Sequence, residues 1–241
     1  NPSTTFGCNS GYLFIGCHSH SSPLDLIHGI SNSCNSYFCQ TYRRILENPQ
    51  YPTIADAYAK WKAYLNEFGF GNKLGIELTN ELTGLIPSTA YFDKYYGKNR
   101  WKALNVISMA IGQGEIETTP LQMANMTAAI ANRGFYYIPH IVKSIGQENR
   151  PVDQKYLTRQ AIDIDSANFE YIIMGMEEAV NGKEGATAMI AAINDIIVCG
   201  KTGTAQNPHG KDHSVFVAFA PKDNPQIAIA VFVENAGFGA T

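Results

Sequence analysis

Charged residues are scarce in this sequence, and neither sign dominates. The 241 residues hold 18 Lys and Arg against 21 Asp and Glu, a formal net charge of −3 at pH 7. Charged residues make up 16% of the chain, against roughly 25% in typical soluble proteins. A protein held to nucleic acid by phosphate contacts needs a basic excess, which is missing here, so we expect no nucleic-acid partner. With 45% hydrophobic residues, the composition also excludes intrinsic disorder and predicts a globular unit.

Long apolar runs and targeting segments are also missing. The longest unbroken apolar run in the second half extends from Ile227 to Val233, well short of the roughly 20 residues of a membrane helix. The chain begins at Asn1, with no charged region before an apolar stretch, so no signal peptide is visible. It stops at Thr241, just after a predicted strand. We therefore expect a fragment of a longer protein, incomplete at both ends.

Cysteine is rare and unevenly placed. Four of the five cysteines fall within the first 39 residues, and an odd, clustered set does not resemble a disulfide framework spread through a fold. Four ligand-type residues have the spacing Cys-x8-Cys-x2-His-x13-Cys: Cys8, Cys17, His20 and Cys34. Three thiolates and one imidazole suit a tetrahedral structural zinc. The spacing leaves open His18 as the imidazole ligand, a disulfide between the first two cysteines, or free thiols. Cys39 and Cys199 are expected to be buried small apolar residues.

Hydrophobic periodicity and turn residues predict an α+β fold in which helices pack on an antiparallel sheet. The predicted helices cover residues 36–46, 53–68, 101–111, 119–132 and 166–181, and the predicted strands cover 195–199, 213–220 and 226–233. Short polar turns between these strands indicate an antiparallel meander. We expect one partial domain, 1–241, made of a loop-rich segment 1–32 with the candidate metal ligands, a mainly helical part 33–190 and C-terminal antiparallel strands 191–241. Asn35 is expected to cap the first helix.

A Lys-Thr-Gly triplet is the most informative feature of the last third. Lys201 supplies a cation on the rim of a strand, and Gly203 lacks a side chain, so another backbone can approach closely. Thr202 and Thr204 place two hydroxyls on the same side, because strand residues two apart point the same way. Such a strand can accept an extended peptide whose carboxylate is held by the cation and the hydroxyls.

Ser33 and Asn35 lie where a loop enters a helix, a place from which a hydroxyl and an amide project into a cleft. In isolation they would be interpreted as a helix cap. Together with Lys-Thr-Gly, however, Ser-x-Asn is one of the signatures of penicillin-recognising serine acyltransferases. With the segments 32–38, 68–78, 111–122 and 200–206 in this order, the chain resembles the transpeptidase domain of penicillin-binding proteins over nearly its whole length. The resemblance is strongest to the elongation-type penicillin-binding protein 2.

The resemblance implies the fold shared by penicillin-binding proteins and serine β-lactamases. It also implies a serine acyl-enzyme mechanism that cross-links peptidoglycan stem peptides, as in a D,D-transpeptidase. Ser33 would relay a proton to the leaving amine, Lys201 would tune its environment, and Asn35 would hydrogen-bond the substrate amide. Thr202 and Thr204 would hold the terminal carboxylate, and the backbone N–H of Thr204 would form half of the oxyanion hole.

The third signature, Ser-x-x-Lys, is missing, because no Lys in the sequence has a Ser three residues before it. We expect this nucleophile segment to lie upstream, so the fragment alone would form no acyl-enzyme. The resemblance implies no catalytic cofactor and a role in cell shape at the periplasmic face of the bacterial inner membrane, with an upstream anchor. It implies β-lactam antibiotics as ligands, and a membrane glycosyltransferase and elongation-complex scaffold proteins as partners. The alternatives are a D,D-carboxypeptidase or β-lactamase-related hydrolase, and a non-catalytic β-lactam or peptidoglycan sensor.

Overall fold

The computed structural model describes residues 8–9, 14–17, 19–21, 23–146, 152–183 and 185–239. Its helices are α1 (Leu26–Ser31), α2 (Asn35–Leu46), α3 (Ile54–Glu67), α4 (Thr89–Tyr96), η1 (a 3-10 helix, Ala103–Ile111), α5 (Pro120–Ala131), α6 (Gln154–Leu157), α7 (Ser166–Asn181) and η2 (a 3-10 helix, Met189–Ala191). Its strands are β1 (Cys8–Asn9), β2 (Phe14–Ile15), β3 (Phe135–Tyr137), β4 (Arg159–Ala161), β5 (Cys199–Ala205), β6 (His213–Ala220) and β7 (Ile227–Val233). Helices combined with antiparallel strands confirm the predicted α+β class. Within these described ranges, no helix has both the length and the apolar character needed to span a bilayer.

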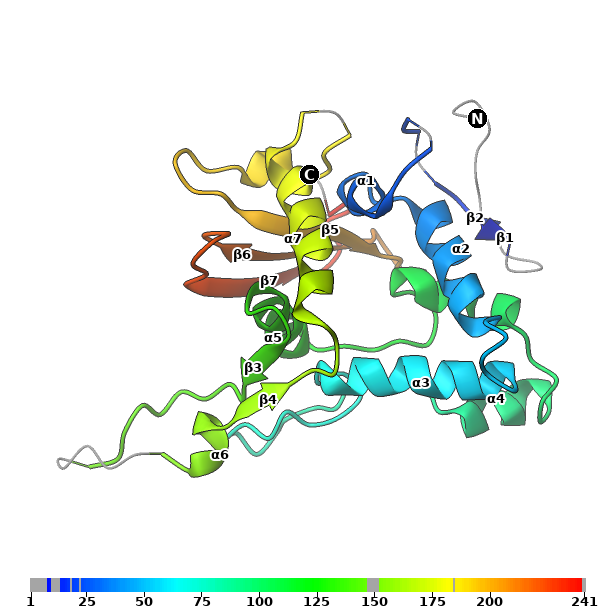
Figure 1. Ribbon diagram of the computed structural model, residues 1–241, viewed down its shortest axis with the longest axis horizontal. Helices are drawn as coiled ribbons and strands as arrows, with labels where there is room; N and C mark the ends of the chain where they lie inside the picture. Colours follow the sequence, from blue (N-terminus) through cyan, green and yellow to red (C-terminus); the bar gives the residue numbers. More distant parts are fainter. Residues whose placement is uncertain are drawn as a thin grey trace.

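The main sheet consists of β5, β6 and β7 in that spatial order, all antiparallel to their neighbours (Figure 1). Its register places Lys201 opposite Val217 and Thr204 opposite Ser214. The predicted meander is therefore confirmed, and β6 has the predicted bounds. β5 is an end strand of this sheet, which leaves the edge with Lys201 and Thr204 available to other parts of the molecule.

Helices α1, α5 and α7 build a core with the sheet. Cys199 and Phe219 lie opposite each other on β5 and β6 and are buried together with residues of α5 and α7. Helix α1 lies against α7 (Figure 1), and Gly175 permits this close approach, because a Cβ at that position would lie 2.7 Å from the Cβ of Ile30. The sheet core thus fixes the position of α1, which directly precedes Ser33.

A second core lies among α2, α3, α4 and η1. The rings of Tyr58, Phe92 and Trp101 stack in pairs with centroids 5.3–5.6 Å apart, and the Tyr58 hydroxyl donates to the carbonyl of Pro87 (2.8 Å). Cys39 is buried in this core and Cys199 in the other, as predicted for both. The turn around Ser33 therefore connects a helix of the sheet core to a helix of the second core.

Helix bounds agree with the sequence where capping side chains mark them. Thr53 accepts a hydrogen bond from the third residue of its helix, Thr119 does the same for α5, and Gly182 follows the last residue of α7, as predicted. The predicted cap of α2 is wrong: Cys34 is the N-cap and its Sγ accepts from the N–H of Tyr37, while Asn35 is the first helical residue.

Other elements also differ from the prediction, which contained none of α4, α6, η2, β3 and β4. Residues 26–31 form α1 rather than loop, because the Asp25 carboxylate caps the N–H of His28. Residues 103–111 form a 3-10 helix interrupted at Val106. β5 confirms the strand predicted for the Lys-Thr-Gly segment, whereas residues 195–198, also predicted as strand, precede it, since Asp195 has a left-handed φ of 63° and turns the chain.

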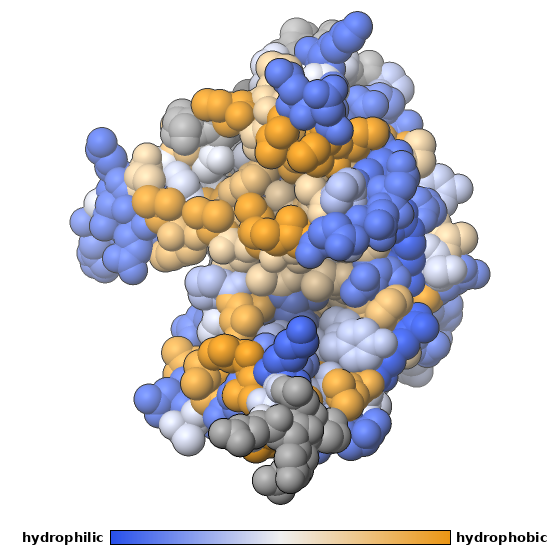
Figure 2. All heavy atoms as spheres, turned by 90° about the vertical axis from the view of Figure 1, so that its left-hand side faces the viewer, coloured by the Kyte–Doolittle hydropathy of each residue, from blue (hydrophilic) through white to orange (hydrophobic). Residues whose placement is uncertain are grey.

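Apolar residues are exposed along β7 and on the arm that carries β3, β4 and α6. The large exposed apolar side chains of β7 are Ile227, Ile229, Val231, Phe232 and Val233. Figure 2 faces the end of the molecule where the arm projects and shows several separate hydrophobic patches among polar residues. Exposed apolar end strands favour pairing with other chain segments. The exposed apolar side chains of β7 thus lie at the edge of the main sheet opposite to the edge formed by β5.

Candidate active site

Ser33 lies in the tight turn between α1 and α2. Its backbone has a left-handed φ of 50°, a conformation that is uncommon for residues other than glycine. Two backbone hydrogen bonds hold the turn, from the N–H of Ser33 to Ile30 O and from the N–H of Cys34 to Gly29 O, both 3.0 Å. The conformation at Ser33 is thus maintained by the packing of α1 rather than by local preference.

Lys201 reaches from β5 to this turn. Its Nζ donates to Oγ of Ser33 and to the carbonyl of Thr202, at 2.8 Å each. Burial lowers the pKa of Lys201 from its ordinary value of 10.5 to about 8, because a charged ammonium loses solvation in a site with little water. The structure therefore brings the two sequence motifs together and gives their lysine a pKa near neutrality.

The other residues of the Lys-Thr-Gly strand have partners of their own. The Thr202 hydroxyl donates to Oγ1 of Thr187 (3.3 Å), and the Thr204 hydroxyl accepts from the N–H of Gly239 (3.2 Å). Gly203 itself has room for a side chain, because a Cβ there would lie 3.4 Å from the Cβ of Val215, whereas a Cβ on Gly239 would clash with the carbonyl oxygen of Gly203. The backbone that approaches is the segment after β7.

Asn35 has a partner in the N-terminal segment. Its side-chain amide donates to the carbonyl of Gly16 at 2.7 Å, so it ties the start of α2 to the segment before α1. The structure thus brings Ser33, Lys201 and Thr202 together around one turn, while the amide of Asn35 is directed to the N-terminal segment.

Two contacts of this region were not predicted from the sequence. Thr187, in the loop after α7, donates to the carbonyl of Ser31 (3.1 Å) and so connects Thr202 to α1. The second contact is made by Gln113, whose Nε2 donates to the carbonyl of Thr204 at 2.7 Å. The position of Gln113 between two glycines was a weak signal for its contact, and nothing in the sequence indicated the contact of Thr187.

Three of the candidate metal ligands lie close together beside the Ser33 turn. The ligand atoms of Cys17, His20 and Cys34 all lie within 4.8 Å of one another, with the two sulfurs 3.7 Å apart and Cys17 Sγ 3.4 Å from His20 Nε2. The sulfur separation is too long for a disulfide bond, about 2.05 Å. Burial raises the pKa of the Cys34 thiol to about 11. The side chain of Cys8 and residue His18 lie outside the described part of the chain.

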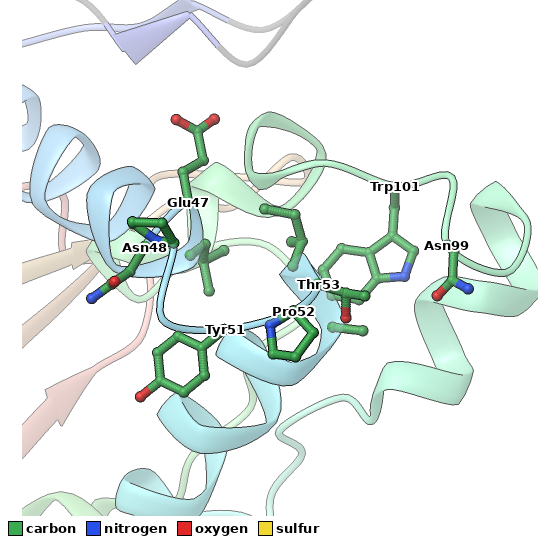
Figure 3. Close-up of a pocket in the computed structure, with 11 residues that line it drawn as sticks. Glu47, Asn48, Tyr51, Pro52, Thr53, Asn99 and Trp101 are labelled. Atoms are coloured by element: carbon green, nitrogen blue, oxygen red, sulfur yellow. The ribbon is translucent and has the colours of Figure 1, made fainter.

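A cavity of about 330 Å³ lies elsewhere, at the end of α2. Figure 3 shows its lining from the α2–α3 loop together with Asn99 and Trp101. None of the Ser33, Lys201 or cysteine sites contributes to it, and its carboxylate, Glu47, is paired with Arg43 at 2.9 Å. The reactive groups therefore lie at the Ser33 turn and not in this cavity.

Comparison with known proteins gives consistent matches. Residues 1–241 match the family described as "Penicillin binding protein transpeptidase domain". The chain is 33% identical over 233 residues to the peptidoglycan D,D-transpeptidase MrdA of Haemophilus influenzae. This alignment covers 90% of this chain and 34% of that relative. Pseudomonas aeruginosa PBP2 in complex with WCK 5153 has a TM-score of 0.77 and 31% identity, over 95% of this chain and 47% of that one. Helicobacter pylori PBP2 in complex with MreC has a TM-score of 0.74 and 25% identity, over 100% of this chain and 43% of that one. The chain spans about a third of the length of the curated relatives it matches.

Proposed function

Because the chain belongs to the penicillin-binding protein transpeptidase family, we propose that it is part of a peptidoglycan D,D-transpeptidase of the elongation type. The observation that carries the proposal is the 2.8 Å contact between Lys201 Nζ and Ser33 Oγ. These atoms belong to segments 168 residues apart, and their contact joins the Ser-x-Asn and Lys-Thr-Gly signatures in one site.

The proposed reaction is the exchange of one amide bond for another through an ester. A serine hydroxyl attacks the carbonyl carbon between two D-alanines, the C–O bond forms, the C–N bond breaks and the terminal D-alanine leaves. The amine of a second stem peptide then attacks the ester, which forms the cross-link and restores the serine. Because the sequence contains no Ser-x-x-Lys, we place the nucleophile outside these 241 residues and expect them alone to form no acyl-enzyme.

Ser33 and Lys201 would handle the proton of the leaving amine. In the proposed acylation step Ser33 Oγ gives its proton to the departing nitrogen and takes one from Lys201 Nζ. The proton of the attacking serine passes to the lysine of the missing motif. A Lys201 pKa of about 8 suits this relay, since a donor works best when its pKa lies near the working pH.

The edge of β5 would bind the substrate. An extended stem peptide would lie along this edge as an added strand, with its terminal carboxylate at Thr202, Thr204 and the Lys201 ammonium. The N–H of Thr204 would form half of the oxyanion hole. Gly203 would leave room for the substrate backbone. Asn35 would turn from Gly16 to the substrate amide when substrate binds.

Ligands, partners and location follow from the same assignment. β-Lactam antibiotics would acylate the serine in place of the stem peptide. The H. pylori relative was solved with MreC, which supports a scaffold protein of the elongation complex as a partner, beside a membrane glycosyltransferase. The site would then act in cell-shape maintenance at the periplasmic face of the inner membrane, with the anchor in another part of the protein.

A structural zinc would fix the Ser33 turn. Two thiols and one imidazole within 4.8 Å fit three positions of a tetrahedral zinc site, and Cys8 would supply the fourth. Because the pKa of Cys34 is about 11, its thiol is protonated without metal, and zinc binding would release that proton. A metal bound by Cys34 would hold both of its neighbours, Ser33 and Asn35. Catalysis itself would need no cofactor.

Fluorescent penicillin tests the enzymatic proposal on the full-length protein that contains this chain. We expect a covalent band that is lost in Lys201→Met and kept in Lys222→Met, whose lysine pairs with Glu177. Product analysis with stem peptides then separates cross-linked dimer from hydrolysed monomer. Absence of a covalent band with the wild type would support the non-catalytic sensor instead, and hydrolysis alone would support the carboxypeptidase.

Elemental analysis of protein purified without chelator tests the zinc proposal. We expect about one zinc per chain, loss of that zinc in Cys34→Ser, and a lower melting temperature after chelation. Cys39→Ser is the matched control, since Cys39 is buried away from the cluster. Metal-free protein with titratable thiols, or with a disulfide, would remove the zinc from the proposal and leave the acyltransferase assignment in place.

A further inference from the structure

We propose that Gln113 is a positioning residue of this active site, which holds the Thr204 peptide so that its N–H faces the reacting carbonyl. The proposal rests on the transpeptidase function above and goes beyond it by assigning a role to a residue outside the Ser-x-Asn and Lys-Thr-Gly signatures. Its basis is the 2.7 Å hydrogen bond from Gln113 Nε2 to the carbonyl of Thr204, across 91 residues of sequence.

This hydrogen bond fixes the direction of the Thr204 backbone. In an antiparallel strand, the N–H and C=O of one residue point to the same side. Because the carbonyls of Thr204 and Thr202 both accept from side chains, Gln113 and Lys201 respectively, we infer that these alternate residues, and with them the N–H of Thr204, face away from β6. The carbonyl of Thr202, two residues earlier, points to the same side and accepts from Lys201 Nζ. The open edge of β5 thus presents the Thr204 N–H beside the Lys201 ammonium.

Gln113 is itself firmly held. Gly112 and Gly114 on either side have left-handed φ values of 72° and 78°, so the loop turns sharply and directs the Gln113 side chain. The N–H of Gln113 donates to Ser108 O (3.2 Å) and that of Gly112 to Met109 O (3.2 Å). Met109 is only 2% exposed in the second core. The amide of Gln113 therefore connects the end of β5 to a rigid part of the helical core.

Thr204 needs such support because of its place in the strand. It is the last residue but one of β5, and strand ends separate from their neighbours more readily than strand centres. A carbonyl oxygen has two lone pairs, so a substrate N–H can bind Thr204 O while Gln113 stays in place. Gln113 is therefore an anchor that remains during the reaction, rather than a plug that the substrate displaces.

The test uses the full-length protein with three measurements on a chromogenic β-lactam. These are the acylation rate constant at saturation, the apparent dissociation constant, and the rate constant for loss of the acyl-enzyme. Gln113→Met removes the donor at similar size, and Gln113→Glu does so while staying polar. Gln226→Met is the matched control, since Gln226 Nε2 also donates to backbone carbonyls, at the β6–β7 turn far from Thr204.

We expect both Gln113 variants to lower acylation and deacylation by about tenfold or more, with the dissociation constant nearly unchanged. Infrared spectra of the acyl-enzyme should show the ester carbonyl band at higher frequency, because it loses a hydrogen bond from Thr204. Unchanged rates and an unchanged band in either folded variant would overturn the positioning role, as would a change confined to the dissociation constant. A wild type that forms no acyl-enzyme would overturn the proposed function, and this inference with it.

Discussion

Replacement of Lys201 by methionine gives a stability change whose size and sign depend on pH. Burial lowers the pKa of Lys201 from 10.5 to about 8. Below pH 8 the folded protein therefore carries an ammonium that would be better solvated in the unfolded chain. Between pH 8 and 10.5 the unfolded state binds more protons, so the free energy of unfolding contributed by this group rises with pH.

The magnitude follows from the two pKa values. One pH unit of difference is worth about 1.36 kcal/mol, so the cost of the buried Lys201 ammonium at neutral pH is about 3 kcal/mol. Methionine has no charge to bury, so Lys201→Met removes this cost. It also loses the hydrogen bonds to Ser33 and Thr202, each worth about 1 kcal/mol. The pH dependence of the difference between variant and wild type thus isolates the charge.

Urea denaturation of both proteins at about pH 7 and about pH 10 measures this difference. We expect Lys201→Met to be more stable relative to the wild type at the lower pH, by about 2–3 kcal/mol compared with the higher pH. Lys222→Met is the control, because the hydrogen bond to Glu177 raises the pKa of Lys222, so its stability difference from the wild type should be nearly the same at both pH values. The stabilisation from that pair is fully present below the ordinary lysine pKa and is lost as pH rises through the raised one. A stability difference for Lys201→Met that is equal at both pH values would refute the buried ammonium.

Three further substitutions test the turn and its supports. Ser33→Gly should raise the free energy of unfolding by about 1 kcal/mol, because glycine adopts the left-handed φ of 50° without strain, whereas Ser33→Ala should give no such gain; thermal denaturation compares the two. Gly175→Ala should destabilise the fold by about 1–3 kcal/mol, since its Cβ would lie 2.7 Å from that of Ile30. An unchanged melting temperature would show that α1 can move away from α7 without loss of stability. Thr187→Val should cost about 1–2 kcal/mol, because it leaves the Ser31 carbonyl without its hydroxyl donor, while Thr187→Ser should restore the loss in the same urea titration.

The sequence predicted those elements whose signals are local. The bounds of β6 and α7 follow from a β-branched run and from a helix closed by Gly182. The cap at Thr119 follows from its Pro120 neighbour and a glutamine at the third helical position. Each of these features depends on residues within a few positions of one another, and such short-range interactions leave a pattern in the sequence.

The elements that escaped prediction depend on contacts made at a distance or on unusual cap chemistry. α1 is six residues long and is stabilised by packing of Ile30 against α7 rather than by its own periodicity. Cys34 acts as the N-cap in place of Asn35, and its Sγ accepts from the N–H of Tyr37. The Gln113 contact joins residues 91 positions apart. Only the meeting of Ser33 with Lys201 was anticipated over such a range, and it came from the family resemblance.

The candidate site is built from elements of two separate cores, so it needs hydrogen bonds that hold these elements in place. α1 belongs to the sheet core through Ile30, whereas α2 belongs to the helical core through Tyr42, so a small shift between the cores would change the position of Ser33. The hydrogen bond from Gln113 joins the helical core to β5, and the one from Thr187 ties the loop after α7 to α1. A proton relay over 2.8 Å tolerates little displacement. Both hydrogen bonds therefore support the geometry of the proposed relay, and substitutions that weaken them should reduce the reaction rate more than they reduce stability.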